Sequence, residues 1–256
     1  MGKFLKTALM LFMVGQAPVQ AATQLTLDTS LDKLPGLERS NKAEKGLPGL
    51  MAIDSQEYAS AIQPTSDFEN LYLRAQLAQN ELAMLTHRVA YLSSTQADVP
   101  AVKGRERALA KLEGKLDGDV RLLTDLARTT LVAEDVDGLL RAYHELDRQG
   151  EVVRVKNRFL TPKANGYRDL NLLVRLPDSQ MVAEVQIHLR SFANIKSGPE
   201  HDFYQQIQEV ERQALAERRS LSEFERARVQ RLRQQSAVLY RQAWEAISPP
   251  GWVSYG

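Results

Sequence analysis

Apolar residues recur at helical spacing in several stretches of this 256-residue chain. The first firm pattern runs from about 67 to 92, with Ser66 or Asp67 placed to cap its start. A second runs from about 101 to 116, and a third from 136 to 149. From residue 200 onward the pattern is helical and rich in charge, with a break near Ser220, which has capping-box spacing to Glu223. We expect these C-terminal helices to serve packing and solvation.

Shorter segments between the helices carry the pattern of strands. After Asp125 the chain changes to β-branched and apolar residues, which predicts a helix end followed by a strand through Val132. Three further strands are predicted at 152–155, 168–176 and 181–189, and a turn joins the last two. This order predicts an α+β fold with a β-α-β-β-β core, a mixed or antiparallel sheet, flanking helices and long C-terminal helices.

Alternation along the last two strands assigns their two faces. One face is apolar: Leu170, Leu172, Val174, Leu176, Ala183, Val185, Ile187 and Leu189. The other face is polar: Asp169, Asn171, Glu184, Gln186 and His188. Antiparallel sheets often leave one face to solvent, so an idle polar face is one interpretation. This face combines carboxylate, amide and imidazole groups and has no lysine, which is more typical of a functional site than of a face that only contacts solvent.

Four cations recur at every fourth position near the second helix and form one stripe: Lys103, Arg107, Lys111 and Lys115. Like charges at this spacing repel one another, and the acids of the same helix point away from most of the stripe. A bound polyanion would relieve the repulsion. An ordinary solvated face, or pairing with acids elsewhere in the fold, is the alternative.

The N-terminus has the features of a cleavable secretory signal. Lys3 and Lys6 precede an apolar stretch, and small residues lead to Ala21, where we expect cleavage. A buried N-terminal helix is the alternative. The expected organisation is a signal peptide (1–21), a linker or extension (22–65), one domain that includes the C-terminal helices (66–248) and a tail (249–256). The expected location is periplasmic or secreted.

Composition excludes several classes of function. The chain has no cysteine, which excludes thiolate catalysis and cysteine-bound zinc. Cleavage would remove two of 33 basic residues and none of 32 acidic ones, so 31 minus 32 gives a net charge of −1 and no support for generic nucleic-acid binding. The four histidines have no paired spacing, so we expect no histidine metal site. No later segment predicts a membrane anchor, and the oligomeric state stays open.

Two separate motifs resemble the RelA/SpoT alarmone synthetase domain. The run 156–171, which contains Pro162-Lys163-Ala164-Asn165-Gly166-Tyr167-Arg168, is similar to the P-K-x-N-G-Y-R-S-L-H segment of that family. The run Ala183-Glu184-Val185-Gln186-Ile187 is similar to its V-E-I/V-Q-I segment. A basic helix, an aspartate that opens a strand and a further helix precede them in the family's order. The resemblance therefore covers about 100–189.

The resemblance implies a nucleotidyltransferase-like fold and transfer of pyrophosphate from ATP to a ribose hydroxyl of a nucleotide or RNA. It implies Mg²⁺ as the cofactor, with Asp125 and Glu184 as its ligands and as the catalytic pair. The residues implied at the donor phosphates are Arg107, Lys111, Lys115 and Arg128. Those implied at the acceptor are Lys163, Tyr167, Arg168, Asn171, Gln186 and His188, with the Tyr167 ring stacking on a base.

Four positions depart from the family's pattern. Asp169 stands in place of its serine and adds negative charge beside an expected phosphate, and Asn171 stands in place of its histidine. Arg128 comes two positions earlier than the family's arginine, and His188 replaces a common arginine. Together with the secretory signal, these features leave two hypotheses. The chain is an exported pyrophosphokinase, a toxin or effector with an unknown acceptor, or a non-catalytic periplasmic binding or interaction module that keeps the fold.

Overall fold

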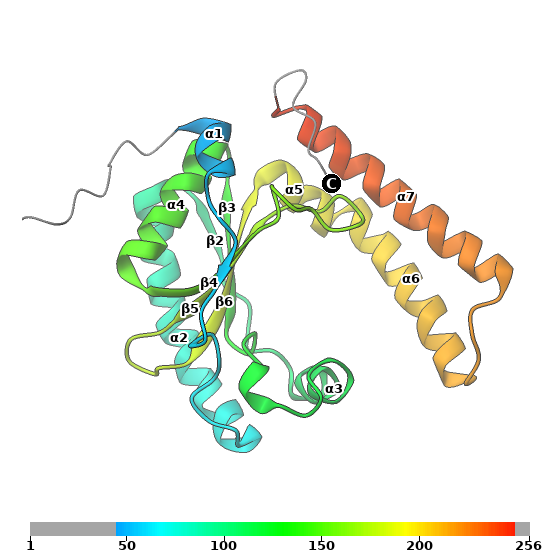
Figure 1. Ribbon diagram of the computed structural model, residues 1–256, viewed down its shortest axis with the longest axis horizontal. Helices are drawn as coiled ribbons and strands as arrows, with labels where there is room; N and C mark the ends of the chain where they lie inside the picture. Colours follow the sequence, from blue (N-terminus) through cyan, green and yellow to red (C-terminus); the bar gives the residue numbers. More distant parts are fainter. Residues whose placement is uncertain (1–44, 249–256) are drawn as a thin grey trace, which may run out of the picture. The chain divides into compact units, whose positions relative to one another are not determined.

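The computed structural model describes residues 45–248, so the expected signal peptide, most of the expected extension and the tail lie outside this part. Its centre is a six-stranded mixed sheet in the order β1-β4-β5-β6-β3-β2 (Figure 1). The strands are β1 (Gln56–Glu57), β2 (Gln96–Asp98), β3 (Arg128–Ala133), β4 (Glu151–Asn157), β5 (Leu170–Arg175) and β6 (Val182–Leu189). β3 and β6 pair in parallel, and the other neighbours are antiparallel. The predicted β-α-β-β-β core is confirmed as β3-α4-β4-β5-β6.

Helices cover both faces of the sheet (Figure 1). α2 (Phe68–Ser93) and α4 (Val136–Gln149) pack on one face, where each begins after an aspartate that caps it, Asp67 or Asp135. On the other side of the sheet lie α3 (Arg105–Lys115), α5 (Arg190–Ser197), α6 (Pro199–Ala216) and α7 (Glu223–Glu245). The capping box of α7 is formed by Ser222 and Glu225, two residues later than expected. No helix in residues 45–248 is long and apolar enough to cross a membrane.

The apolar sheet face forms the core beneath α2 and α4. Leu131, Leu172 and Ile187 are fully buried there. Full burial of such a side chain contributes about 1.5–3 kcal/mol to stability. Because successive strand residues face opposite sides, a one-residue slip would expose this set. The same alternation fixes Glu184 and Gln186 on the opposite, polar face.

The described end of the expected linker or extension, residues 45–65, packs on the fold and is not a free linker. Residues 46–51 form α1 (Gly46–Met51), and Leu47 and Leu50 are buried in the core. The Gln63 side chain donates to the carbonyls of Leu123 and Val182 and accepts from the Val182 amide. A six-residue helix and a two-residue strand are too short to show periodicity in the sequence.

Candidate active site

The first candidate carboxylate, Asp125, lies in the turn that precedes β3. Its Oδ2 atom accepts from Lys103 Nζ at 2.7 Å and pairs with Lys111 Nζ at 2.9 Å. Its Oδ1 atom is buried without a hydrogen-bond partner among the described residues. Burial raises the pKa of Asp125, but the two lysines outweigh this effect and hold the pKa below its ordinary value. Asp125 is therefore ionised and has one oxygen available to a cation.

The second candidate carboxylate, Glu184, lies on β6 and faces the polar side of the sheet. Its partners in register are Arg128 on β3 and Leu173 on β5. Asn171 Nδ2 donates to Glu184 Oε1 at 2.7 Å, and Arg154 Nη2 donates to Asn171 Oδ1 at 2.9 Å. Asn171, which was expected at the acceptor, is fully buried, and its side chain holds Glu184 through this hydrogen bond.

A groove of about 200 Å³, here called the Glu184 groove, lies beside this carboxylate. Its charged and amide lining consists of Arg128, Glu184, Gln186 and Lys196. Arg128 Nε is buried without a partner in the described part of the chain. Gln79 on α2 fixes the start of β3, because its amide accepts from Arg128 N and donates to Arg128 O, each at 2.9 Å. An arginine that lacks a partner beside a small groove suits a phosphate oxygen.

The basic stripe expected from the sequence is divided in the structure. α3 begins at Arg105, so Lys103 precedes the helix. Lys111 pairs with Asp125, whereas Arg107 and Lys115 are exposed and have no carboxylate within ion-pair distance in residues 45–248. Of the expected donor-phosphate residues, Lys111 and Arg128 thus lie at the candidate carboxylates.

A buried network surrounds Asp169, the residue at the family's serine position. Its two oxygens accept from Arg158 Nη1 at 2.7 Å and from the Tyr167 hydroxyl at 2.8 Å. His188 Nε2 lies 2.7 Å from the same hydroxyl and 3.7 Å from Asp169 Oδ2. Burial raises the pKa of Asp169, but His188 and Arg158 outweigh this effect and lower it. The charge of Asp169 is thus compensated within the protein, which removes the expected conflict with a phosphate.

Tyr167 follows a turn that requires glycine. Gly166 has a φ of +80°, and a Cβ atom there would lie 3.2 Å from the Cβ atom of Tyr240 on α7. The Tyr167 ring packs edge-on against the rings of His188 and Tyr240. Lys163 Nζ lies over the ring, 4.8 Å from its centroid. A base that stacks on this face would have to displace the Lys163 ammonium.

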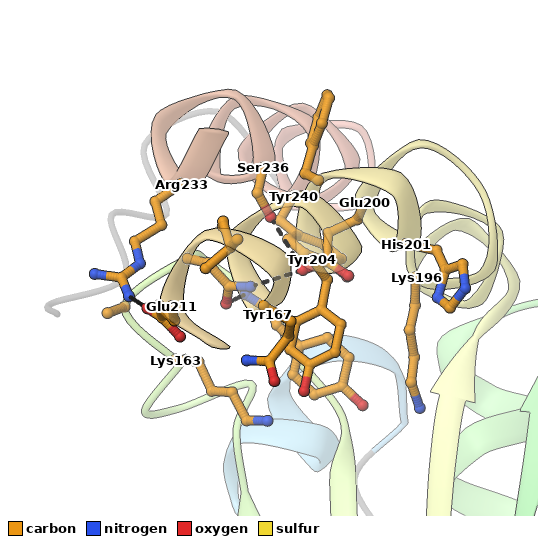
Figure 2. Close-up of a pocket in the computed structure, with 15 residues that line it drawn as sticks. Lys163, Tyr167, Lys196, Glu200, His201, Tyr204, Glu211, Arg233, Ser236 and Tyr240 are labelled. Carbon is orange, nitrogen blue, oxygen red and sulfur yellow. Dashed lines mark hydrogen bonds and ion pairs between the residues drawn. The ribbon is translucent and has the colours of Figure 1, made fainter. Parts of the chain in front are cut away.

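A larger cleft of about 750 Å³, here called the Tyr167 cleft, is lined by the 163–167 turn and by α5, α6 and α7 (Figure 2). Its aromatic and ionisable lining consists of Lys163, Tyr167, Lys196, Glu200, His201, Phe203, Tyr204, Glu211, Arg233 and Tyr240. Burial raises the pKa of Glu200, which accepts long hydrogen bonds from Asn165 at 3.3 Å and Ser236 at 3.4 Å. Aromatic walls with a few polar groups are typical of a small-molecule site.

Like Asn171, two further residues expected at the acceptor, Arg168 and His188, line neither cavity. The Arg168 guanidinium lies 4.2 Å from the centroid of the Trp244 ring, and it donates to the carbonyl of Phe159. Burial lowers the pKa of Arg168 to about 10. His188 is buried against Tyr167. Both side chains therefore support the loop that carries Tyr167. Gln186, also expected at the acceptor, lines the Glu184 groove, and Lys163 and Tyr167 line the cleft.

Asp125 and Glu184 have the chemistry of magnesium ligands, because carboxylate oxygens are what magnesium prefers. No group of three or more carboxylate, histidine or cysteine side chains is placed to hold a metal ion in the described part of the chain. Magnesium is commonly held by one or two carboxylates together with water and substrate phosphates. Of the two carboxylates, Asp125 has a buried oxygen without a partner among the described residues.

Four cations of this region were not among the expected site residues: Lys103, Arg154, Arg158 and Lys196. Alternation along β4 places Arg154 on the polar face, and Arg158 belongs to the motif run, so both had a sequence signal. The sequence placed Lys103 in the basic stripe but did not indicate that it pairs with Asp125. Lys196 had no signal, because its position depends on how α5 folds back from the end of β6.

Solved structures with a similar fold include small alarmone synthetases. Small alarmone synthetase 2 from Bacillus subtilis matches with a TM-score of 0.50 and 19% identity, over 70% of this chain and 97% of that chain. A GTP pyrophosphokinase family protein from Streptococcus pneumoniae (TM-score 0.49, 15% identity, 71% and 93% coverage) is also similar. The type VI effector Tas1, solved in complex with its immunity protein, is similar with a TM-score of 0.48 and 20% identity, over 68% of this chain and 96% of that chain. No protein-family model and no curated protein match the sequence. The chain has the RelA/SpoT-like alarmone synthetase fold.

Proposed function

We propose that the chain is an exported RelA/SpoT-like pyrophosphokinase that transfers pyrophosphate from ATP to a ribose hydroxyl of a nucleotide or RNA. One observation carries the proposal: Glu184 and Arg128 lie in register beside a groove, and both Arg128 and Asp125 have buried polar atoms without partners. Buried polar atoms rarely lack a hydrogen-bond partner unless a ligand or ion supplies one. The alarmone synthetase fold supports the same reaction class.

The cations around Asp125 and Glu184 would bind the phosphates of ATP. Lys103 and Lys111 both contact one oxygen of Asp125, so their combined charge exceeds that of the carboxylate. The excess positive charge attracts the donor phosphates. Arg128 can clamp phosphate oxygens with two N–H groups, whereas each lysine supplies a point charge.

The transfer forms a bond between the acceptor's ribose oxygen and the β-phosphorus of ATP. The bond from that phosphorus to the oxygen shared with the α-phosphorus breaks, and AMP leaves with this oxygen and its electron pair. The hydroxyl proton passes to Glu184, which Asn171 holds through a 2.7 Å hydrogen bond. Arg128 stabilises the charge that develops on the transferred group.

Magnesium, when bound at Asp125 and Glu184, supplies positive charge to the transferring phosphates. A metal ligand must be deprotonated. Lys103 and Lys111 hold the pKa of Asp125 low, so this carboxylate is ready to coordinate at neutral pH.

The proposed place of action follows from the N-terminal signal. Export would take the chain to the periplasm or beyond, where little ATP is present. A pyrophosphokinase would therefore act after delivery into another cell, as a toxin or effector on that cell's nucleotides or RNA.

A binding module without catalysis is the second candidate. It is favoured by the Tyr167 ring, whose face is covered by Lys163 in this structure, where the family resemblance implies a stacking platform. The Tyr167 cleft would then hold a ligand without transfer.

An assay with ATP labelled on the γ-phosphate tests the proposal. The chain without residues 1–21 is incubated with magnesium, labelled ATP and, in turn, GDP, GTP, ADP or tRNA. We expect label on one acceptor, AMP in equal amount, a loss of about 1,000-fold in Glu184→Gln and no change in the control Lys45→Met. Nucleotide binding without transfer to any acceptor would support the binding module. Wild-type activity in Glu184→Gln would show that the mechanism is wrong.

A further inference from the structure

Lys196 forms the boundary between the two cavities. It lies on α5, which follows β6 directly. It lines both the Tyr167 cleft and the Glu184 groove, and it is the residue that the two linings share. Figure 2 shows its side chain extending from α5 toward the sheet. A ligand that reaches from one cavity into the other must pass this ammonium.

The Lys196 ammonium has a hydrogen bond but no ion pair within residues 45–248. Nζ donates to Gln186 Oε1 at 2.8 Å and lies 5.8 Å from the centroid of the Tyr167 ring. Burial lowers the pKa of Lys196, and the more distant charges of Asp169 and Glu184 offset part of this effect. A partly buried ammonium without a counterion destabilises the folded protein. A bound anion would supply the missing counterion and recover that stability.

We infer that Lys196 binds the pyrophosphoryl group as it passes from the donor in the Glu184 groove to the acceptor in the Tyr167 cleft. The inference rests on the proposed function. Reacting atoms of two substrates held in adjoining cavities must meet where the cavities meet, and Lys196 occupies that boundary. No bond to Lys196 forms or breaks. Its charge and N–H groups stabilise the phosphoryl oxygens in the donor-bound and acceptor-bound states and between them.

Lys196 differs from Lys103, Lys111 and Arg158, which are paired with carboxylates. Lys103 and Lys111 are engaged by Asp125, and Arg158 by Asp169. Lys196 has a neutral amide as its partner, so an incoming phosphate displaces no ion pair. The flexible four-carbon stem of lysine lets the ammonium follow the group across the boundary.

Titration with inorganic pyrophosphate tests the inference without relying on turnover. The chain without residues 1–21 is titrated by calorimetry in magnesium-containing buffer, alongside Lys196→Met, Lys196→Arg and the control Lys45→Met. We expect the Kd to rise at least about 10-fold in Lys196→Met, to stay within about threefold in Lys196→Arg and to be unchanged in Lys45→Met. Without ligand, the Tm of Lys196→Met should equal or exceed that of the wild type, because an unpaired, partly buried charge is removed.

Three results would overturn the inference: unchanged pyrophosphate affinity in Lys196→Met, absence of pyrophosphate binding by the wild type, or a lowered Tm that accompanies the lost affinity and marks a structural role. The experiments distinguish failure of the Lys196 inference from failure of the proposed function. If Lys196→Met loses pyrophosphate binding but no acceptor is modified by the wild type, the pyrophosphokinase proposal fails and the Lys196 site stands. If Glu184-dependent transfer is found and Lys196→Met retains full affinity and rate, the Lys196 inference alone fails.

Discussion

Polar groups near Glu184 and in the Asp169 network differ in how fully the protein pairs them, although Glu184 lies on β6 and Asp169 directly precedes the adjacent strand β5. Asp169 is fully buried, and both of its oxygens have protein partners. Near Glu184, by contrast, Asp125 Oδ1, Arg128 Nε and Arg154 Nε are buried without partners in the described part of the chain. A network that is complete within the protein stabilises the fold. Incomplete groups beside a groove are suited to a ligand that supplies the missing contacts.

The largest effect on stability should come from Asp169→Ala. The substitution leaves the charge of Arg158 and the hydroxyl of Tyr167 without their partner, which should lower the free energy of unfolding by about 3 kcal/mol. Urea denaturation of the wild type and variant measures the difference. Asp169→Asn keeps the size and one acceptor oxygen, so it should lose less. Stability within about 0.5 kcal/mol of the wild type in Asp169→Ala would remove the distinction between the two regions.

A smaller loss, about 1 kcal/mol, is expected for Asp125→Asn. The asparagine leaves the ammonium groups of Lys103 and Lys111 close together without a counterion, but both can turn toward solvent. Adding Lys111→Met to this variant should restore part of the loss, which a double-mutant cycle by denaturation would quantify. If the double variant is no more stable than Asp125→Asn, repulsion between the lysines is not the cause.

The next largest effect should be a dependence of stability on pH, which comes from His188 in the Asp169 network. Burial lowers the pKa of His188 below its ordinary 6.5, so the unfolded chain binds a proton more readily than the folded one. The free energy of unfolding should therefore fall as the pH drops below 6.5, by about 1.4 kcal/mol for each unit of pKa difference. Denaturation at pH 7.5 and 5.5 measures this slope, and His188→Gln should flatten it. A wild type that gains stability on acidification relative to His188→Gln would indicate a charged His188 paired with Asp169.

The smallest change in stability should belong to Glu184→Gln, within about 0.5 kcal/mol of the wild type. Glutamine keeps the oxygen that accepts from Asn171, and the site is open to water through the groove. The same variant should lose transfer activity, so it separates function from stability. Thermal denaturation provides the check, and a loss of several degrees would place Glu184 in the structural framework with Asp169.

The sequence predicted features that depend on local periodicity. Alternation placed Glu184 and Gln186 opposite Ile187 because a strand has no other way to bury its apolar side chains. The motif supplied residue types in the 163–171 run but not their burial, which depends on α7. Arg168 is covered by Trp244, and the Tyr167 ring meets Tyr240. The sequence could not place Lys196, because its neighbours come from β6 and from the 163–167 turn, which lie elsewhere in the sequence.

The contribution of α7 to the Tyr167 cleft has a consequence for biosynthesis. Asp125 and Glu184 are translated well before Arg233, Ser236 and Tyr240, which complete the cleft wall. Until α7 has been made, the cleft lacks this wall and the core lacks Tyr240 and Trp244. The cleft is therefore complete only after α7, the last helix of the described residues, has been synthesised.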